Sequence, residues 1–507
     1  MTNKVSRRVS LLTDTILSLL SWFLPIITGL IATPVIVKSL GRVEYGLYAS
    51  LIGFISYSIP FGIGKILVKY VAEYRASGED KRLSESISST IWLSLGLTIT
   101  GCTVVVLSAG YIVQSVLALP EEQFSIGRNG IYLASATILA MMVSQIFQFI
   151  LQGLHRFRPY LLITNLSGIL LNVGNVGLAL TGAGVEALLW WNLTSILIMG
   201  GVFAATALPG LPEFSIRPYF RSREWPFVMR YAASIVVYQV FGNILFIFER
   251  AWIIRRFGTE SATYYLIPMT LAIYLHSIAT SSILVVFPLV NELLHDRERL
   301  EMLYLKANKM IVAFISFMAV VLIFGGDGVL ELWVGAEIAK NSYHLLIIHT
   351  LTFAFTASLM IIGMIAEGFR FPYFNSILTV TWVIVVIPLI IFVVDPWGLE
   401  GVAGARLFGV VLTLPLLFVF ERIYLGRVLW RFWSATLGRL LIAGAAAAAV
   451  LVGIDASVFG LRWYSIALRL ALGIGTFLLV VAVSGYFSKE ERQMLLELVY
   501  RRKASQE

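Results

Sequence analysis

The chain has 507 residues, of which 58% are hydrophobic and 13% are charged. A water-soluble protein carries roughly 45–50% apolar and about 25% charged residues, and soluble cores stop growing at roughly 250–300 residues. The composition therefore excludes a water-soluble enzyme and predicts a protein embedded in a lipid bilayer.

The net charge is +9, which would point to nucleic acid if the basic side chains formed a solvent-exposed patch. Here they lie in short segments between apolar runs, so we interpret them as topology signals and expect no nucleic-acid partner. The lone cysteine, Cys102, excludes an intramolecular disulfide and a thiolate zinc cluster. No spacing of Ser, His, Asp or Glu indicates a metal site or catalytic residues, so we predict that the chain is not an enzyme.

Apolar runs that are long enough to cross a membrane, which takes about 20 residues, follow one another along the chain. We predict an all-α membrane protein with about fourteen transmembrane helices. The predicted spans are 15–37, 46–70, 87–118, 129–152, 160–181, 184–207, 227–256, 261–291, 304–333, 341–366, 373–394, 398–420, 436–454 and 463–487.

Lys and Arg gather in every second connection between these spans. With the N-terminus in the cytoplasm, 28 of the 38 basic residues lie nearer the cytoplasmic face, as the positive-inside rule requires. We therefore predict a multi-pass protein of the cell (cytoplasmic or inner) membrane with both termini in the cytoplasm. The longest connections, 71–86, 208–226 and 292–303, are too short for a soluble catalytic domain.

An internal repeat relates the two halves of the chain. Residues 38–48 and 255–265 share a basic residue, a glycine and a tyrosine in the same order, at a constant offset of 217 in residue number. The Gly-Val pairs at 184–185 and 401–402 have the same offset. Because each copy has an even number of spans, both copies insert in the same orientation. This pattern predicts two parallel six-helix lobes around a central cavity, plus two extra C-terminal helices.

The repeat and the connections predict five parts of the chain. They are an N-lobe at 1–210 with spans one to six, an inter-lobe linker at 211–226, a C-lobe at 227–425 with spans seven to twelve, spans thirteen and fourteen at 426–487, and a cytoplasmic tail at 488–507.

Six motifs lie around these anchors and further along the two halves. They are Leu40-Gly41-Arg42-Val43-Glu44-Tyr45-Gly46-Leu47-Tyr48, Glu249-Arg250, Phe257-Gly258, Tyr264-Tyr265, Leu332-Trp333-Val334-Gly335 and Gly398-Leu399-Glu400-Gly401-Val402-Ala403-Gly404-Ala405. Through them the chain resembles, over roughly residues 10–420, the polysaccharide-transporter branch of the multidrug/oligosaccharidyl-lipid/polysaccharide flippase superfamily, which includes the Wzx-type O-antigen flippases. One departure is Glu249, where that family usually has Asp.

This resemblance implies a flippase that moves a polyprenyl-pyrophosphate-linked oligosaccharide from the cytoplasmic to the outer leaflet. It also implies alternating access without a cofactor, driven by an ion gradient such as Na⁺ or H⁺. The expected partners are the lipid bilayer, the lipid-linked glycan and other membrane proteins of polysaccharide assembly. We expect the protein to be a monomer.

Charged residues inside spans are candidate functional residues, because each costs at least about 2.5–3.5 kcal/mol in the membrane. Pyrophosphate is an anion, and arginine can bind it through two parallel hydrogen bonds. We predict that Lys65, Arg250 and Arg406 are cavity cations that hold the pyrophosphate. Lys69 and Arg255 are secondary candidates, although these two could instead extend to the membrane interface.

Uncharged polar residues recur on single faces of three predicted helices, where they could bind sugar hydroxyls or form interhelical hydrogen bonds. The candidates are Gln148, Asn172, Asn175, Gln239 and Asn243. Asp14 and Glu249 are the acids best placed to bind a coupling ion, and the longer side chain of Glu249 would alter any coupling there. A basic neighbour could equally neutralise Glu249.

Three other readings remain. A drug/cation antiporter of the same superfamily would need cavity carboxylates, whereas the charges within these spans are mostly basic. An integral-membrane glycan polymerase or ligase would need a sizeable outer loop, which the sequence does not provide. A scaffold that acts through its basic tail would lose function on deletion of 488–507 and keep it in cavity variants.

Overall fold

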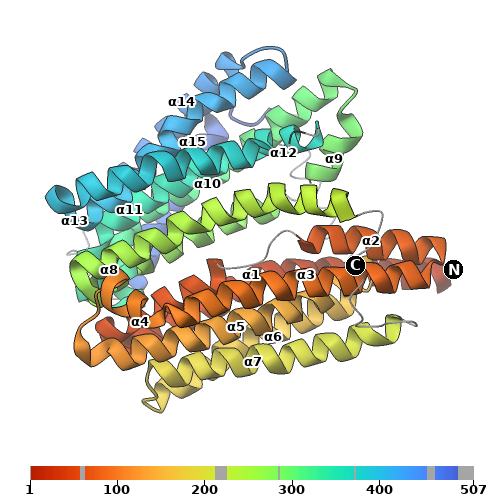
Figure 1. Cartoon of the computed structure of the whole chain (residues 1–507). Coiled ribbons are helices and arrows are strands. Elements are labelled where there is room, and N and C mark those ends of the chain that lie inside the picture. Colours follow the sequence, from red (N-terminus) through yellow and green to blue (C-terminus); the bar gives the residue numbers. More distant parts are fainter. Residues whose placement is uncertain are drawn as a thin grey trace. The chain divides into compact units, whose positions relative to one another are not determined.

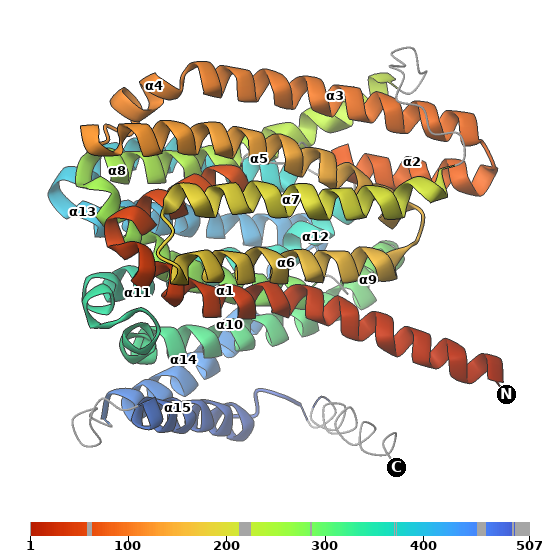
Figure 2. The same ribbon diagram turned by 90° about the horizontal axis from the view of Figure 1, so that it is seen from below.

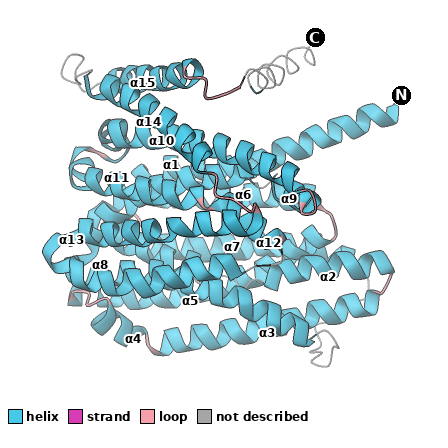
Figure 3. Ribbon diagram, turned by 90° about the horizontal axis from the view of Figure 1, so that it is seen from above, coloured by secondary structure: helices cyan, strands magenta, loops and turns pink. Residues whose placement is uncertain are grey.

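The computed structural model describes residues 2–57, 63–211, 225–283, 286–369, 371, 373–453, 463–488 and 491. Within these ranges every regular element is a helix (Figures 1 and 3), which confirms the predicted all-α class. The elements are α1 (Thr2–Tyr57), α2 (Ile63–Ser77), α3 (Asp80–Leu107), α4 (Ala109–Tyr111), η1 (Ile112–Val116), α5 (Glu121–Gly153), α6 (Phe157–Leu180), α7 (Val185–Ala207), η2 (Leu208–Gly210), α8 (Trp225–Ile283), α9 (Val286–Leu293), α10 (Arg297–Val334), α11 (Ala336–Ser358), α12 (Met360–Gly368), α13 (Tyr373–Tyr424), α14 (Trp430–Gly453) and α15 (Trp463–Val483).

Three of these helices contain a glycine at which the backbone leaves the helical conformation. Gly41 in α1, Gly258 in α8 and Gly398 in α13 have φ values of 75°, 82° and 57°. A positive φ costs glycine little and other residues more, because glycine has no Cβ. Each of these long helices is therefore two helical segments joined at a glycine.

Ten segments of the described residues are long and apolar enough to cross a membrane. Two of them, in α1 and α13, contain a glycine break. The long helix α8 is also broken, at Gly258, but is not among the ten. This number is roughly consistent with the predicted fourteen spans.

The backbone repeats at the offset found in the sequence. Gly41 and Gly258 are related by this offset and have matching ψ values of 171° and 174°. Helices α3 and α10 begin at Asp80 and Arg297, which are related by the same offset. The predicted lobe boundaries stay a prediction, because most of the linker at 211–226 and most of the tail at 488–507 fall outside the described residues.

The first compact unit consists of Met1–Ile267 and Pro372–Ala405. In it α5 packs against α3 and α7, and α7 packs against α6 (Figure 2). The core between α2, α3, α5 and α7 includes Val71, Ile87, Ile150 and Phe203, all buried. Large apolar side chains also cover the outside of this unit, for example Leu107 and Leu180. Such a continuous exposed apolar surface suits lipid rather than water.

The second compact unit consists of Pro268–Phe371 and Arg406–Glu507. Helix α10 packs against α11, α14 and α15, and α14 packs against α15. Arg469 of α15 joins this group, because its Nη2 donates to the carbonyl of Phe324 at 3.0 Å and its Nη1 lies 3.6 Å from Oδ2 of Asp327. The two C-terminal helices are thus anchored on α10.

Candidate functional site

One functional candidate of the first unit, Arg250, lies where the second half of α1 contacts α8. Gly46 and Gly53 of α1 are seven residues apart, which places them on one face of the helix two turns from each other. A Cβ atom on Gly46 would lie 1.8 Å from the carbonyl oxygen of Thr259, and one on Gly53 would lie 2.4 Å from Nε of Arg250. The two glycines therefore let α8 approach α1 closely. Gly46 contacts the backbone of α8, and Gly53 contacts the side chain of Arg250.

Arg250 lies at the contact with Gly53, and it is only 7% exposed. Its Nη1 donates to the carbonyl of Phe246 at 3.0 Å, and its guanidinium carbon lies 5.9 Å from the centre of the Phe246 ring. The neighbouring Glu249 is fully buried. Gly258 lies eight residues further along, which corresponds to about 12 Å of helix. Arg250 is thus a buried cation within the predicted span 227–256, in a space that Gly53 leaves open.

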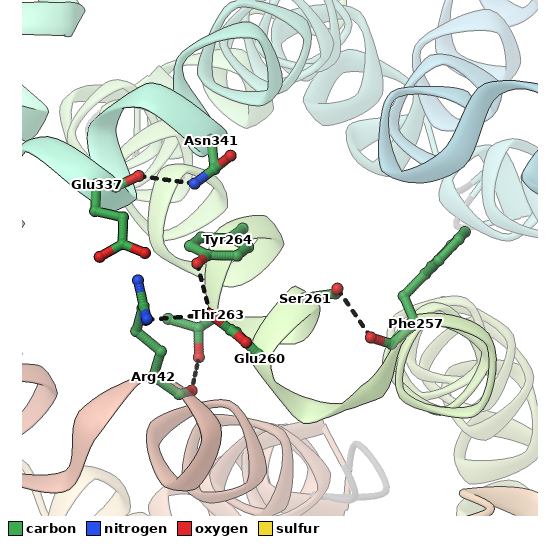
Figure 4. A network of polar contacts seen from close by, with 8 residues as sticks. All are labelled: Arg42, Phe257, Glu260, Ser261, Thr263, Tyr264, Glu337 and Asn341. Carbon is green, nitrogen blue, oxygen red and sulfur yellow. Dashed lines mark hydrogen bonds and ion pairs between the residues drawn. The ribbon is translucent and has the colours of Figure 1, made fainter.

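A network of polar side chains lies near the contact between Gly46 and Thr259, just after Gly41 and Gly258 in the chain (Figure 4). Nε of Arg42 lies 3.1 Å from Oε1 of Glu260, and the hydroxyl of Tyr264 donates to the same oxygen at 2.7 Å. The hydroxyl of Thr263 donates to the backbone carbonyl of Arg42 at 2.5 Å. We call Arg42, Glu260, Thr263 and Tyr264 the corner network. Sequence reasoning placed Arg42 and Tyr264 in family motifs but gave neither a role.

Further polar contacts lie near the same end of the first unit. Arg256 pairs with Asp395 at 3.2 Å, and Arg255, which is exposed, donates to the carbonyl of Ser115. Asn129 of α5 donates to Glu186 of α7 at 2.9 Å. Arg255 is exposed, and its role as a secondary candidate stays a prediction.

The polar residues predicted on α5 and α6 are at least half-buried. Gln148 donates to the hydroxyl of Ser144 at 3.3 Å, and Asn172 donates to the hydroxyl of Thr28 in α1 at 3.1 Å. Asn175 is buried, and its Oδ1 has no hydrogen-bond partner among the described residues. The bond from Asn172 joins α6 to α1, and the roles of these polar residues stay predictions.

The second unit holds Arg406, which is 6% exposed, in the second half of α13. It also holds a buried acid that the sequence did not single out. Glu421 of α13 is fully buried and accepts hydrogen bonds from the hydroxyl of Tyr304 at 2.7 Å, from Nε1 of Trp433 at 2.7 Å and from the backbone N–H of Leu429 at 3.0 Å. These partners come from α10, α14 and the turn before α14.

Several predicted site residues are not placed by these contacts. Asn243 is half-buried in α8. The side chains of Asp14, Lys65, Lys69 and Gln239 lie outside the described residues. Their roles stay predictions.

The arrangement of helices is that of a known class of membrane transporter. The lipid II flippase MurJ, in an inward closed conformation, superimposes with a TM-score of 0.69 at 15% identity, over 93% of this chain and 98% of that chain. An inward-facing multidrug resistance transporter of the MATE family, within the MOP superfamily, gives 0.63 at 17% identity, over 80% and 94%. A MOP superfamily transporter from Pyrococcus furiosus, whose binding pocket is described as reversed in polarity, gives 0.57 at 15% identity, over 82% and 94%. The chain therefore has the fold of MOP superfamily transporters.

The sequence assigns the family within that class. Residues 11–294, more than half of the chain, match the family described as polysaccharide biosynthesis protein, and the chain belongs to this family. The predicted resemblance to the flippase superfamily is thereby confirmed. No curated protein matches the sequence.

Proposed function

We propose that the protein is a flippase that moves a polyprenyl-pyrophosphate-linked oligosaccharide from the cytoplasmic to the outer leaflet by alternating access. Its family is named for polysaccharide biosynthesis, and its fold is shared with a protein named as a lipid II flippase. A flippase of this kind must compensate the charge of a phosphorylated head group while that group crosses the apolar region of the bilayer.

The observation that carries the proposal is the buried guanidinium of Arg250. A cation in an apolar span is costly, and Gly53 leaves space for it where any side chain would collide. An arginine held in this way offers planar, paired donors that match the oxygens of a phosphate. Arg250 would bind the pyrophosphate, and Lys65 and Arg406 would be further cations of the same pathway.

The driving force in this proposal is an ion gradient, with Na⁺ or H⁺ as the coupling ion and Asp14 or Glu249 as its binding group. Glu249 is fully buried next to Arg250. A change in its charge would therefore be felt directly by the cation that holds the substrate. The protein would act in the cell membrane, beside other membrane proteins of polysaccharide assembly.

The test is reconstitution in vesicles with a fluorescent polyprenyl-pyrophosphate oligosaccharide under imposed Na⁺ and H⁺ gradients. The wild-type protein should move the lipid between leaflets. Arg250→Ala should lower transfer by more than about tenfold, and Arg250→Lys should lower it less. Arg255→Ala is the matched control, because it removes an exposed arginine from the same helix. No transfer by the wild-type protein under any gradient would contradict the proposal.

A drug/cation antiporter is the second candidate, because the same fold occurs in multidrug transporters of the MATE family. Such a transporter would expel a lipophilic cation from the same vesicles. If Arg250→Ala increased cation transport and the wild-type protein ignored the pyrophosphate lipid, the antiporter would be the better assignment.

A further inference from the structure

The contact between Gly46 and Thr263 has an unusual symmetry. The two residue numbers differ by 217, the offset of the repeat, so the residues occupy the same position in the two copies. A Cβ atom on Gly46 would lie 2.9 Å from the hydroxyl oxygen of Thr263. When equivalent positions of two copies touch, the axis that relates the copies passes between them. The two helices thus cross on the pseudo-twofold axis of the repeat.

The crossing is close because one side of it has no side chain. The Cβ position of Gly46 falls 1.8 Å from the carbonyl oxygen of Thr259, so the backbones themselves are in contact. Both segments begin their helices immediately after a glycine with positive φ, Gly41 and Gly258. The two helices that follow these breaks cross each other at the ends of the spans that we predict to face the outside of the cell.

The corner network joins the two copies around this crossing. Arg42 belongs to the first copy, and Glu260, Thr263 and Tyr264 belong to the second. The side chains of Arg42 and Glu260 are 34% and 41% exposed, and ion pairs at this exposure are weak and readily broken. By contrast, the bond between Asn129 and Glu186 lies within the first copy.

We propose that this crossing is the outer gate of the transporter and that the ion pair of Arg42 and Glu260 latches it. The inference rests on the proposed alternating access, in which the two copies must separate at the outer end to release the lipid. The structure shows the gate closed, with the copies in backbone contact at Gly46. Opening breaks the ion pair and the bond from Thr263, so both bonds favour the closed state over the open one.

The first experiment needs no substrate, so its result is independent of whether the lipid is correctly identified. Spin labels are attached to cysteines at Val43, which is 41% exposed, and Ser261, on a Cys102→Ser background that removes the only native cysteine. Electron–electron double resonance should show a major short distance and a minor longer one. Glu260→Gln should raise the ratio of long to short by about two- to fivefold, the effect of losing one partly exposed ion pair.

Arg256→Gln is the matched control, because it breaks another ion pair on α8 close to the same end, the one with Asp395. It should leave the ratio unchanged. A single unchanging distance in all variants would overturn the proposal, as would an equal shift in Arg256→Gln.

The second experiment locks the gate. Cysteines at Arg42 and Glu260 are joined by a short bifunctional thiol reagent that a reductant cleaves, and cysteines at Asn129 and Glu186 receive the same treatment. The first cross-link should stop lipid transfer reversibly, whereas the second should leave at least half of it. Undiminished transfer with the first cross-link, or equal inhibition by both, would show that this crossing does not open.

Discussion

Two buried glutamates, one in each compact unit, have different surroundings. Glu421 in the second unit accepts three hydrogen bonds from Tyr304, Trp433 and the backbone of Leu429. Glu249 in the first unit is equally buried, but its chain neighbour is Arg250, whose guanidinium lies against Gly53. Glu421 is enclosed by donors from three parts of the chain. Glu249 is followed in the chain by a buried cation, which lies against a glycine.

The difference separates a structural role from a functional one. A buried carboxylate with three donors holds its helices together, and removing it leaves those donors without a partner in a dry environment. Arg250 is a buried cation in a predicted apolar span, a position that costs stability. Costs of this kind are typical of functional sites.

The largest effect is expected for Glu421→Ala. The change orphans the hydroxyl of Tyr304, Nε1 of Trp433 and the N–H of Leu429. A buried donor left without a partner costs about 1–3 kcal/mol, so we expect a loss of about 3 kcal/mol or more. Thermal unfolding in detergent measures this loss. Glu421→Gln keeps one acceptor oxygen and should lose about half as much. If both variants were as stable as the wild type, the structural role of Glu421 would be wrong.

Arg250→Ala should have the opposite profile. We expect lipid transfer to fall by more than about tenfold, the loss of roughly 1.4 kcal/mol or more of charge-assisted binding, while the unfolding temperature stays the same or rises. The initial rate of transfer in vesicles and the melting curve, measured on one preparation, check both parts. A variant that unfolds early and transports normally would reverse the assignment of the two glutamate regions.

Gly53→Ala sharpens the comparison without removing a charge. The new methyl group would collide with Nε of Arg250, and the flexible guanidinium, rather than the backbone, should move. We expect transfer to fall by about three- to tenfold with a change in stability of less than about 1 kcal/mol. Gly96→Ala is the control, because a Cβ atom there meets no neighbouring atom. Equal activity of the two variants would show that the position of Arg250 is unimportant.

Much of the fold followed from the sequence because the bilayer leaves few alternatives. Apolar runs of sufficient length must be helices there, since every backbone group needs an internal partner. The offset of the repeat correctly related Gly41 to Gly258. Both copies have a glycine there because the break needs a positive φ, which glycine adopts at little cost.

The buried contacts did not follow from the sequence. Glu421 ends an apolar run like many interfacial acids, and its partner Tyr304 is 117 residues away, so no spacing rule connects them. The ion pair of Arg42 and Glu260 joins the two copies. The sequence around each residue gives no sign of how the two copies pack against each other, so this pair could not be predicted. Arg250 was found because a charge in an apolar span is conspicuous, whereas the clearance that Gly53 provides became visible only in three dimensions.

The smallest effect is expected for a third acid, Glu491. It tests whether the burial of a carboxylate determines how much stability is lost when the carboxylate is removed. Glu491 pairs with Lys309 at 2.6 Å, with side chains 23% and 18% exposed. Desolvation raises the pKa of Glu491, but hydrogen bonds from Lys309 and from Ser488 outweigh it and hold that pKa below its ordinary value. A depressed pKa stabilises the folded state above the ordinary value near 4.5, and this contribution is lost as the pH falls through the lower, folded value.

The melting temperature of the wild type minus that of Glu491→Gln, measured from pH 7 down to pH 3, should therefore be small, positive and constant at neutral pH. It should vanish at the acid end. The expected contribution is about 1 kcal/mol or less, as for other partly exposed pairs. If Glu491→Gln cost as much as Glu421→Ala, the number of donors around a carboxylate, rather than its burial, would govern stability in this protein.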